Sequence, residues 1–126
     1  MTNVPIRVVL ADDESAVRAL LGVALGVELD ISVVGEAADG EQAVSLVDSC
    51  HPDAIILDLM MPVLDGMEAI GRIKDAWPDC KIVVFSALDA ARMSAEALTR
   101  GADAYVEKTR IFPELGDTLS RLCVAA

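Results

Sequence analysis

Short runs of apolar residues alternate along the chain with longer segments in which apolar residues recur at helical spacing. The short runs are rich in β-branched side chains and almost continuously apolar, which is typical of strands buried on both faces of a sheet. These predicted strands span residues 6–11, 31–37, 54–57, 81–85 and 104–107. Between them, five segments carry an apolar stripe that predicts a helix. The stripes consist of Val17, Leu20, Leu21, Ala24 and Leu25; Ala43, Leu46 and Val47; Met67, Ile70 and Ile73; Ala91, Ala95 and Leu98; and Ile111, Leu115, Leu119 and Leu122.

The regular alternation of strand and helix predicts an α/β fold. Such an order usually produces parallel strands joined by right-handed crossovers. Five strands and five helices in 126 residues fit a three-layer sandwich, in which a five-stranded parallel sheet lies between two layers of helices. The length corresponds to one domain. The sequence shows no internal repeat, low-complexity tract or interdomain linker, so we expect a single domain over residues 1–126.

Composition defines the character of the core and the surface. Hydrophobic residues make up 54% of the chain but aromatic residues only 3%, so the core is expected to be aliphatic. The formal net charge of -11, together with the lack of a basic stripe, argues against direct nucleic-acid binding by this domain. An acidic surface suits a cation site or a basic partner, although most of these carboxylates simply favour solubility.

The cysteines and the N-terminus bear on localisation. Cys50, Cys80 and Cys123 are odd in number and lack a CxxC spacing, which favours reduced thiols in a cytoplasmic protein. Residues 1–10 do not have the pattern of a signal peptide. No stretch approaches the roughly 20 apolar residues of a membrane span, so we expect no membrane association.

Polar side chains follow four of the five predicted strands. Asp12 and Asp13 follow the first strand, Asp58 the third, Ser86 the fourth and Lys108 the fifth. In open parallel sheets, ligands bind beyond the carboxyl ends of the strands. We therefore expect three carboxylates, a hydroxyl and an ammonium group to meet at one edge of the sheet.

This combination of groups has a chemical meaning. Clustered carboxylates repel one another unless a cation relieves the repulsion, and their hard oxygen atoms suit Mg²⁺. A carboxylate can also act as a nucleophile that forms an acyl phosphate. Lys108 and the metal ion would then offset charge on the phosphoryl oxygens, to which Ser86 can donate a hydrogen bond.

Each of these residues also has a purely structural interpretation. Asp12 or Asp13 alone is most simply the N-cap of the following helix. Asp58 and Ser86 can be turn residues, and an isolated lysine is usually exposed. Four strands that deliver complementary groups to one edge outweigh these separate interpretations. Tyr105 is expected in the core, and His51, which precedes a proline, is expected to mark the end of a helix.

With these residues in place, the chain resembles the receiver domains of bacterial two-component response regulators. The resemblance covers about residues 5–124 and rests on the motifs VVLADDE (8–14), AIILDLMMPVLDGMEAI (54–70), KIVVFSA (81–87) and GADAYVEK (101–108). The segment 33–47 further resembles receivers that precede a helix-turn-helix DNA-binding domain. The family adopts the flavodoxin-like strand order 2-1-3-4-5.

The resemblance implies a role for each site residue. Asp58 is the implied phosphoryl acceptor, and the implied ligands of Mg²⁺ (or Mn²⁺) are Asp13, Asp58 and the backbone carbonyl of Met60, with Asp12 acting through water. Ser86 and Lys108 would contact the phosphoryl oxygens, and Tyr105 would be an aromatic switch residue. Many relatives have proline after the lysine, whereas Thr109 follows Lys108 here, which leaves the shape of the last loop open.

The resemblance also implies partners and an output. The phosphoryl group would come from a histidine kinase or a phosphotransfer protein, or from a small phosphodonor. The output would pass to a downstream effector protein or to a missing effector domain, with the chain either standing alone or forming part of a DNA-binding transcriptional regulator. A homodimer could form through the fourth helix, the fifth strand and the fifth helix. The chain would assist its own phosphorylation without being an enzyme.

Three other classes of protein fit the sequence less well. An aspartyl phosphatase needs a second acid two residues after the nucleophile, but that position holds Met60. A nucleotide- or flavin-binding domain needs a glycine-rich turn after the first strand, where residues 11–14 read ADDE. A receiver-like interaction module that is not phosphorylated usually lacks an acidic residue or the lysine, and none is missing here.

Overall fold

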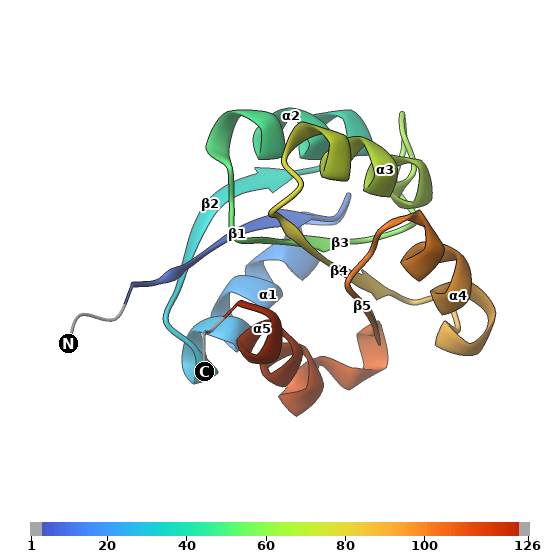
Figure 1. Cartoon of the computed structure of the whole chain (residues 1–126). Helices are drawn as coiled ribbons and strands as arrows, with labels where there is room; N and C mark the ends of the chain where they lie inside the picture. Colours follow the sequence, from blue (N-terminus) through green and yellow to red (C-terminus); the bar gives the residue numbers. More distant parts are fainter. Residues whose placement is uncertain (1–3, 124–126) are drawn as a thin grey trace.

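The computed structural model describes residues 4–123, without the side chains of Glu28 and Phe112. The ends of the predicted domain, residues 1–3 and 124–126, lie outside the described residues. Strands and helices alternate as predicted (Figure 1). In chain order they are β1 (Ile6–Ala11), α1 (Ser15–Glu28), β2 (Ile31–Ala37), α2 (Gly40–Cys50), β3 (Ala54–Leu57), α3 (Gly66–Ala76), β4 (Lys81–Ser86), α4 (Ala90–Arg100), β5 (Ala104–Glu107) and α5 (Gly116–Cys123).

The five strands form one parallel sheet in the order β2-β1-β3-β4-β5. This confirms the predicted flavodoxin-like strand order and the three-layer arrangement. Helices α2 and α3 cover one face of the sheet and α1 and α5 cover the other, while α4 lies beside β5 (Figure 1). All the carboxyl ends of the strands therefore lie at one edge of the sheet, where loops can bring residues from different strands together.

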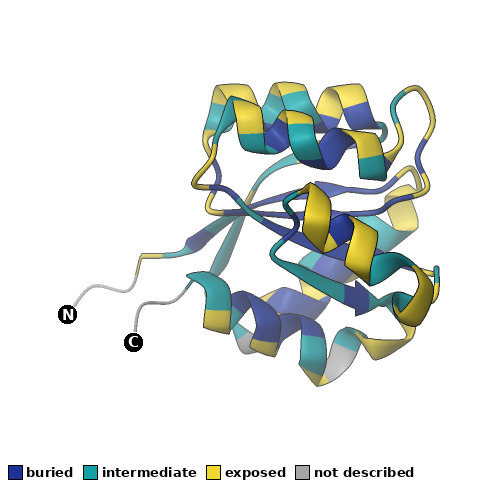
Figure 2. Cartoon of the chain, turned by 45° about the vertical axis from the view of Figure 1, so that its right-hand side comes forward, coloured by how far each residue is buried: buried dark blue, intermediate teal, exposed yellow. Residues whose placement is uncertain are grey.

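Two aliphatic clusters form the core, one on each face of the sheet. The first lies under α2, α3 and α4 and includes Ile55, Ile70 and Ile73. The second lies under α1 and α5 and includes Leu21 and Leu119. Strands β1, β3 and β4 are buried on both faces, as predicted (Figure 2). The same prediction is wrong for β2 and β5, which remain partly exposed because an edge strand has a neighbour on one side only.

The helical stripes are confirmed for α2 and α3 but not everywhere. In α1, Leu20 is 55% exposed, because the buried stripe runs through Leu21, Ala24 and Leu25. The stripe predicted for α4 is wrong, since Ala91, Ala95 and Leu98 all lie on its exposed side. Its alanines include both buried Ala97 and exposed Ala91 and Ala95, so the presence of alanine does not single out a buried face. The described part of α4 buries one side chain fully, that of Ala97.

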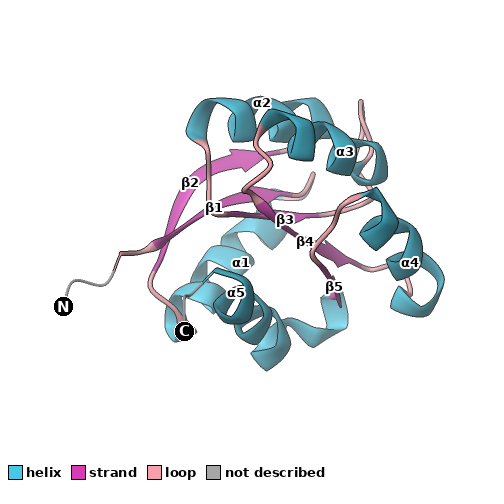
Figure 3. Cartoon of the chain, viewed as in Figure 1, coloured by secondary structure: helices cyan, strands magenta, loops and turns pink. Residues whose placement is uncertain are grey.

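The last helix begins differently from the prediction. Lys108–Arg110 form a 3₁₀ turn and Ile111–Leu115 a π-helical turn before α5 begins at Gly116 (Figure 3). The apolar stripe persists through this irregular start, because Ile111, Leu115, Leu119 and Leu122 all pack on the same core cluster. The 3₁₀ turn gives the loop after Lys108 its shape, with Thr109 exposed.

Candidate functional site: an acidic cluster at the sheet edge

Backbone pairing brings Asp12 and Asp58 to the same edge of the sheet. The N–H of Asp12 donates to the carbonyl of Ala37 at 3.0 Å, and the N–H of Asp58 donates to the carbonyl of Ala11 at 2.9 Å. Each aspartate thus extends the parallel ladder by one residue beyond its strand. Both are deeply buried, with 1% of Asp12 and 4% of Asp58 exposed. The sequence prediction that these strands deliver acids to one place is correct for this pair.

Local turns orient three of the side chains. Asp12 Oδ1 accepts from the N–H of Glu14 at 2.9 Å, and Asp58 Oδ1 accepts from the N–H of Met60 at 3.2 Å. Ser86 Oγ accepts in the same way from the N–H of Leu88 at 3.1 Å. Each bond joins a side chain to the backbone two residues later, as in an Asx- or ST-turn. One oxygen of each carboxylate is therefore fixed by its own loop, and the second is left for other contacts.

The capping interpretation of Asp12 and Asp13 is wrong. Helix α1 begins at Ser15, its N-cap residue is Glu14, and no side chain caps it. Helices α2, α3 and α4, in contrast, each begin with an aspartate whose side chain accepts from the first turn. The turn interpretation of Asp58 and Ser86 is correct, but it fixes only one oxygen of Asp58.

Lys108 joins the two buried aspartates. Its Nζ lies 2.7 Å from Asp12 Oδ2 and 3.3 Å from Asp58 Oδ2. Burial raises the pKa of Asp58 above its usual range, against the opposing effects of the Met60 N–H and the Lys108 charge. Burial lowers the pKa of Lys108, but the hydrogen bond to Asp12 and the charge of Asp58 outweigh it, so this pKa lies above its ordinary value. Lys108 is therefore charged at neutral pH.

Asp13 completes an acidic triad. One carboxylate oxygen from each of Asp12, Asp13 and Asp58 lies within 4.8 Å of the others, and Asp13 is exposed where the other two are buried. Two buried acids and one exposed acid carry three negative charges against the single positive charge of Lys108. Oxygen-only donors with this surplus of negative charge suit a hard divalent cation, so the residues present fit a divalent-metal site.

Ser86 and Tyr105 lie on the adjacent strands β4 and β5. Leu57 pairs with Val84, so Asp58 and Ser86 lie at the ends of adjacent strands, and Ser86 is fully buried. Tyr105 packs partly buried against the core, as expected, and its hydroxyl donates to the carbonyl of Leu88 at 2.9 Å. Burial raises the pKa of Tyr105. The ring therefore connects β5 to the loop that follows Ser86.

The sequence pattern did not reveal the contacts that Arg18 and Gly66 make with the backbone of Asp12 and Asp58. Arg18 Nη1 donates to the backbone carbonyl of Asp12, and Arg18 Nε donates to Glu36 at 2.8 Å. A Cβ atom at Gly66 would lie 2.1 Å from the carbonyl oxygen of Asp58, so only glycine fits there. No motif pointed to Arg18, whereas the DG pair before α3 was a visible signal for Gly66.

The fold and the acidic edge define a doubly wound α/β module whose acidic triad, at the carboxyl ends of the strands, fits a divalent-metal site. The family model described as the response regulator receiver domain matches residues 8–120. The chain belongs to the response regulator receiver family, a family of phosphorylation-based two-component signalling. This membership confirms the prediction that the domain is a signalling module rather than an enzyme.

Individual relatives and a solved structure agree with this result. The chain is 35% identical over 119 residues to the uncharacterized transcriptional regulatory protein YxjL of Bacillus subtilis, covering 94% of this chain and 55% of that protein. It is 39% identical over 121 residues to a protein-glutamate methylesterase/protein-glutamine glutaminase of Rhodospirillum centenum, covering 93% of this chain and 31% of that protein. The response regulator domain of Thermotoga maritima CheB superposes with a TM-score of 0.87 at 28% identity, covering 98% and 99% of the two chains.

The chain spans about half the length, or less, of the curated relatives it matches. Those relatives have different outputs by name, a transcriptional regulator in one case and a methylesterase in the other. Among the described helices, none combines the length and the hydropathy needed to cross a bilayer.

Proposed function

We propose that the chain forms one receiver domain over residues 1–126 and accepts a phosphoryl group on Asp58. The observation that carries this proposal is the difference between the two buried aspartates. Both oxygens of Asp12 are engaged, one by the N–H of Glu14 at 2.9 Å and the other by Lys108 at 2.7 Å. The Oδ2 atom of Asp58 has only the longer 3.3 Å contact with Lys108. Burial also raises the pKa of Asp58, which makes its carboxylate a more basic nucleophile than an ordinary aspartate.

The acidic triad supports a divalent metal beside Asp58. Asp13 and Asp58 would hold Mg²⁺ or Mn²⁺ directly, together with the backbone carbonyl of Met60, and Asp12 would hold it through water. When bound, the ion would offset negative charge on the phosphoryl oxygens and on the three carboxylates. The Met60 loop is anchored at the site, because its N–H donates to Asp58 Oδ1.

Lys108 and Ser86 would stabilise the phosphorylated form. A phosphoryl group on Asp58 places about two negative charges where one carboxylate stood. The Lys108 ammonium already lies within 3.3 Å of that carboxylate. Ser86 Oγ accepts from Leu88 N–H, so its own hydrogen can be donated to a phosphoryl oxygen. Both groups make their contacts more strongly once the phosphoryl group is present, which favours transfer.

The change at Asp58 would reach a partner through Tyr105 and α4. Movement of Ser86 toward the phosphoryl group would displace Leu88, whose carbonyl accepts from the Tyr105 hydroxyl. Helix α4 follows this loop, and the described structure buries only Ala97 of it fully. A helix with so little buried surface can change position at small cost in free energy. The face formed by α4, β5 and α5 would then bind a partner or a second copy.

The phosphodonor would be a histidine kinase or a phosphotransfer protein. The Asp58 carboxylate oxygen would attack phosphorus while the P–N bond of a phosphohistidine breaks, and the released imidazole would take up a proton. The output would pass through a separate effector protein or through an effector domain, such as the DNA-binding part of a transcriptional regulator.

The test is the intact mass of the protein after incubation with acetyl phosphate and Mg²⁺. We expect the mass of one phosphoryl group to be added to the wild type and lost when EDTA replaces Mg²⁺. Asp58→Asn is expected to stay unmodified, and Asp117→Asn, which removes an exposed carboxylate from α5, is expected to behave as the wild type. An added phosphoryl group on Asp58→Asn would show that the acceptor is another residue.

A further inference from the structure

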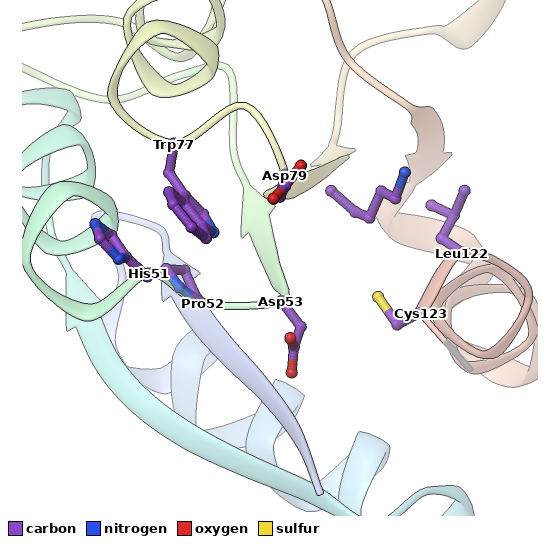
Figure 4. Close-up of a pocket in the computed structure, with 8 residues that line it drawn as sticks. His51, Pro52, Asp53, Trp77, Asp79, Leu122 and Cys123 are labelled. Carbon is purple, nitrogen blue, oxygen red and sulfur yellow. The ribbon is translucent and has the colours of Figure 1, made fainter. Parts of the chain in front are cut away.

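A cavity of about 280 Å³ opens at the opposite edge of the sheet from the acidic triad. Asp53 directly precedes β3 and Lys81 begins β4, so the cavity lies at the amino ends of the strands. It is lined by His51, Pro52, Asp53, Trp77, Asp79, Lys81, Leu122 and Cys123. Figure 4 shows His51 and Trp77 on one side, Leu122 and Cys123 on the other, and Asp53 and Asp79 between them. None of these residues takes part in the site around Asp58.

The aromatic side of this cavity is a stacked pair of rings. The rings of His51 and Trp77 lie with their centroids 4.0 Å apart and their planes 4° from parallel. Each residue ends a helix, α2 for His51 and α3 for Trp77. His51 has a left-handed backbone with φ 47°, and Arg7 Nη1 donates to its carbonyl at 2.9 Å. The stacked rings thus form a flat surface, and the helix ends and the Arg7 hydrogen bond fix the backbone that carries them.

Asp79 is the group in this cavity that favours a cation. Helices α2 and α3 end at lining residues, and a helix carboxyl end carries partial negative charge. Two exposed carboxylates, Asp53 and Asp79, add full negative charges. The cations beside them are Lys81 in the lining and Arg7, whose Nη1 contacts the His51 carbonyl. Asp53 Oδ2 accepts from the N–H of Arg7 at 2.9 Å. Within residues 4–123, the Asp79 carboxylate has neither a hydrogen bond nor an ion pair.

A guanidinium group matches a flat aromatic surface beside a free carboxylate. It is planar, it stacks on aromatic rings, and it donates two parallel hydrogen bonds to a carboxylate. The cavity is open and lies just below the roughly 300–1,000 Å³ of small-molecule sites, which suits a side chain better than a whole metabolite. We propose that this cavity is a second binding site, which takes an arginine side chain of a polypeptide partner between the His51–Trp77 stack and Asp79.

Trp77 is the single tryptophan of the chain, so it reports directly on this cavity. The full chain is titrated with acetyl-Gly-Arg-Gly-amide at low ionic strength, and the Trp77 fluorescence and its indole N–H resonance are recorded. The same peptide with citrulline is the neutral control of equal shape. We expect a saturable change with the arginine peptide and none with the citrulline peptide. An equal response to both peptides, or no saturable response, would overturn the proposal.

Three variants separate a specific site from general attraction to an acidic protein. Asp79→Asn should weaken binding about two- to fivefold, and Lys81→Gln should strengthen it by a similar factor, because a like charge is removed. Asp117→Asn removes the same charge as Asp79→Asn from a position outside the cavity and should leave the affinity nearly unchanged. Equal weakening by both aspartate variants would mean non-specific attraction only.

A small guanidinium compound tests the assignment to a polypeptide. Ethylguanidinium carries the same charged group without a peptide backbone, so it should bind more weakly than the tripeptide. Tighter binding of ethylguanidinium would show that the cavity takes a small molecule and that the assignment to a polypeptide partner is wrong. The far-UV circular dichroism and the urea denaturation midpoint of each variant check that the fold is intact, whether or not Asp58 is phosphorylated.

Discussion

The two edges of the sheet carry the same types of charged side chain in different surroundings. At the carboxyl edge, Lys108 contacts Asp12 and Asp58, both of which are buried. At the amino edge, Lys81 lines the cavity together with Asp53 and Asp79, both of which are exposed. Within residues 4–123, Lys81 forms no ion pair.

Burial accounts for the difference between the two groups. The attraction between unit charges grows as the effective dielectric constant falls, and water screens exposed pairs to a small net effect. At the carboxyl edge the charges therefore affect one another's pKa values, whereas the amino edge leaves the Asp79 carboxylate, which has no hydrogen-bond partner within residues 4–123, available for a ligand. The first arrangement suits a switch that responds to one added phosphoryl group, and the second suits a docking site.

The largest expected effect concerns the close packing that buries the carboxyl edge. A Cβ atom at Gly66 would lie 2.1 Å from Asp58 O and 2.6 Å from Leu59 Cα, both backbone atoms that cannot move aside easily. Gly66→Ala should lower the free energy of unfolding by about 3 kcal/mol or more in urea denaturation. Gly71 lies in the same helix, and a Cβ atom added there would have no neighbour within 4 Å. Gly71→Ala should stabilise the protein by about 0.5–1 kcal/mol, and equal effects of the two variants would contradict the packing described.

The next largest effect is the difference in stability between the Lys108→Ala and Lys81→Ala variants. Lys108→Ala leaves two buried carboxylates without their cation and should lower the free energy of unfolding by about 2–3 kcal/mol. The pKa of Lys108 is raised in the folded state, so its charge stabilises the fold at pH values below the ordinary pKa of 10.5. This stabilisation is lost only as pH rises through the folded-state pKa. Lys81→Ala should change stability by less than about 0.5 kcal/mol.

Magnesium sharpens the same comparison. Added Mg²⁺ should restore part of the stability of Lys108→Ala, because a divalent cation can replace the lost charge beside the triad. It should have little effect on the difference between wild type and Lys81→Ala. Equal losses for the two lysine variants, with no rescue by Mg²⁺, would show that burial does not distinguish the two edges.

The smallest effect concerns the charge of Asp58 itself. Burial raises the pKa of Asp58 in the folded state, so protonation of its carboxylate stabilises the fold. This stabilisation is fully present at pH values below the ordinary pKa of 3.8 and is lost as pH rises through the folded-state pKa. At neutral pH the ionised carboxylate therefore opposes folding. Asp58→Asn should stabilise the protein by about 1 kcal/mol at pH 7, and the gain should shrink toward pH 4. A loss of stability at pH 7 would mean that pairing with Lys108 outweighs burial.

Much of the fold could be predicted because the signals were local. Continuous β-branched runs gave four of the five strand ranges as observed and placed the end of the other, β4, one residue early. The same runs located Asp12, Asp58, Ser86 and Lys108, since the carboxyl ends of parallel strands share one edge. The exposed side of α4 was not predictable, because alanine is found both buried, at Ala97, and exposed, at Ala91 and Ala95, in this helix.

The amino edge could not be predicted for a related reason. Its cavity combines the ends of α2 and α3, two residues of α5 and the starts of two strands, and no motif connects them in sequence. His51 was expected only as a helix end. It does end α2, but its ring also stacks on Trp77, a contact set by how α2 and α3 pack side by side.

We propose that the buried carboxyl edge directs phosphorylation to Asp58 alone. Borohydride reduces an aspartyl phosphate to homoserine, so treatment of the acetyl phosphate-labelled protein, followed by peptide mass mapping, locates the acceptor residue. Homoserine at position 58, and at no other aspartate, is the predicted result. Homoserine at position 12 or 13 would contradict the account.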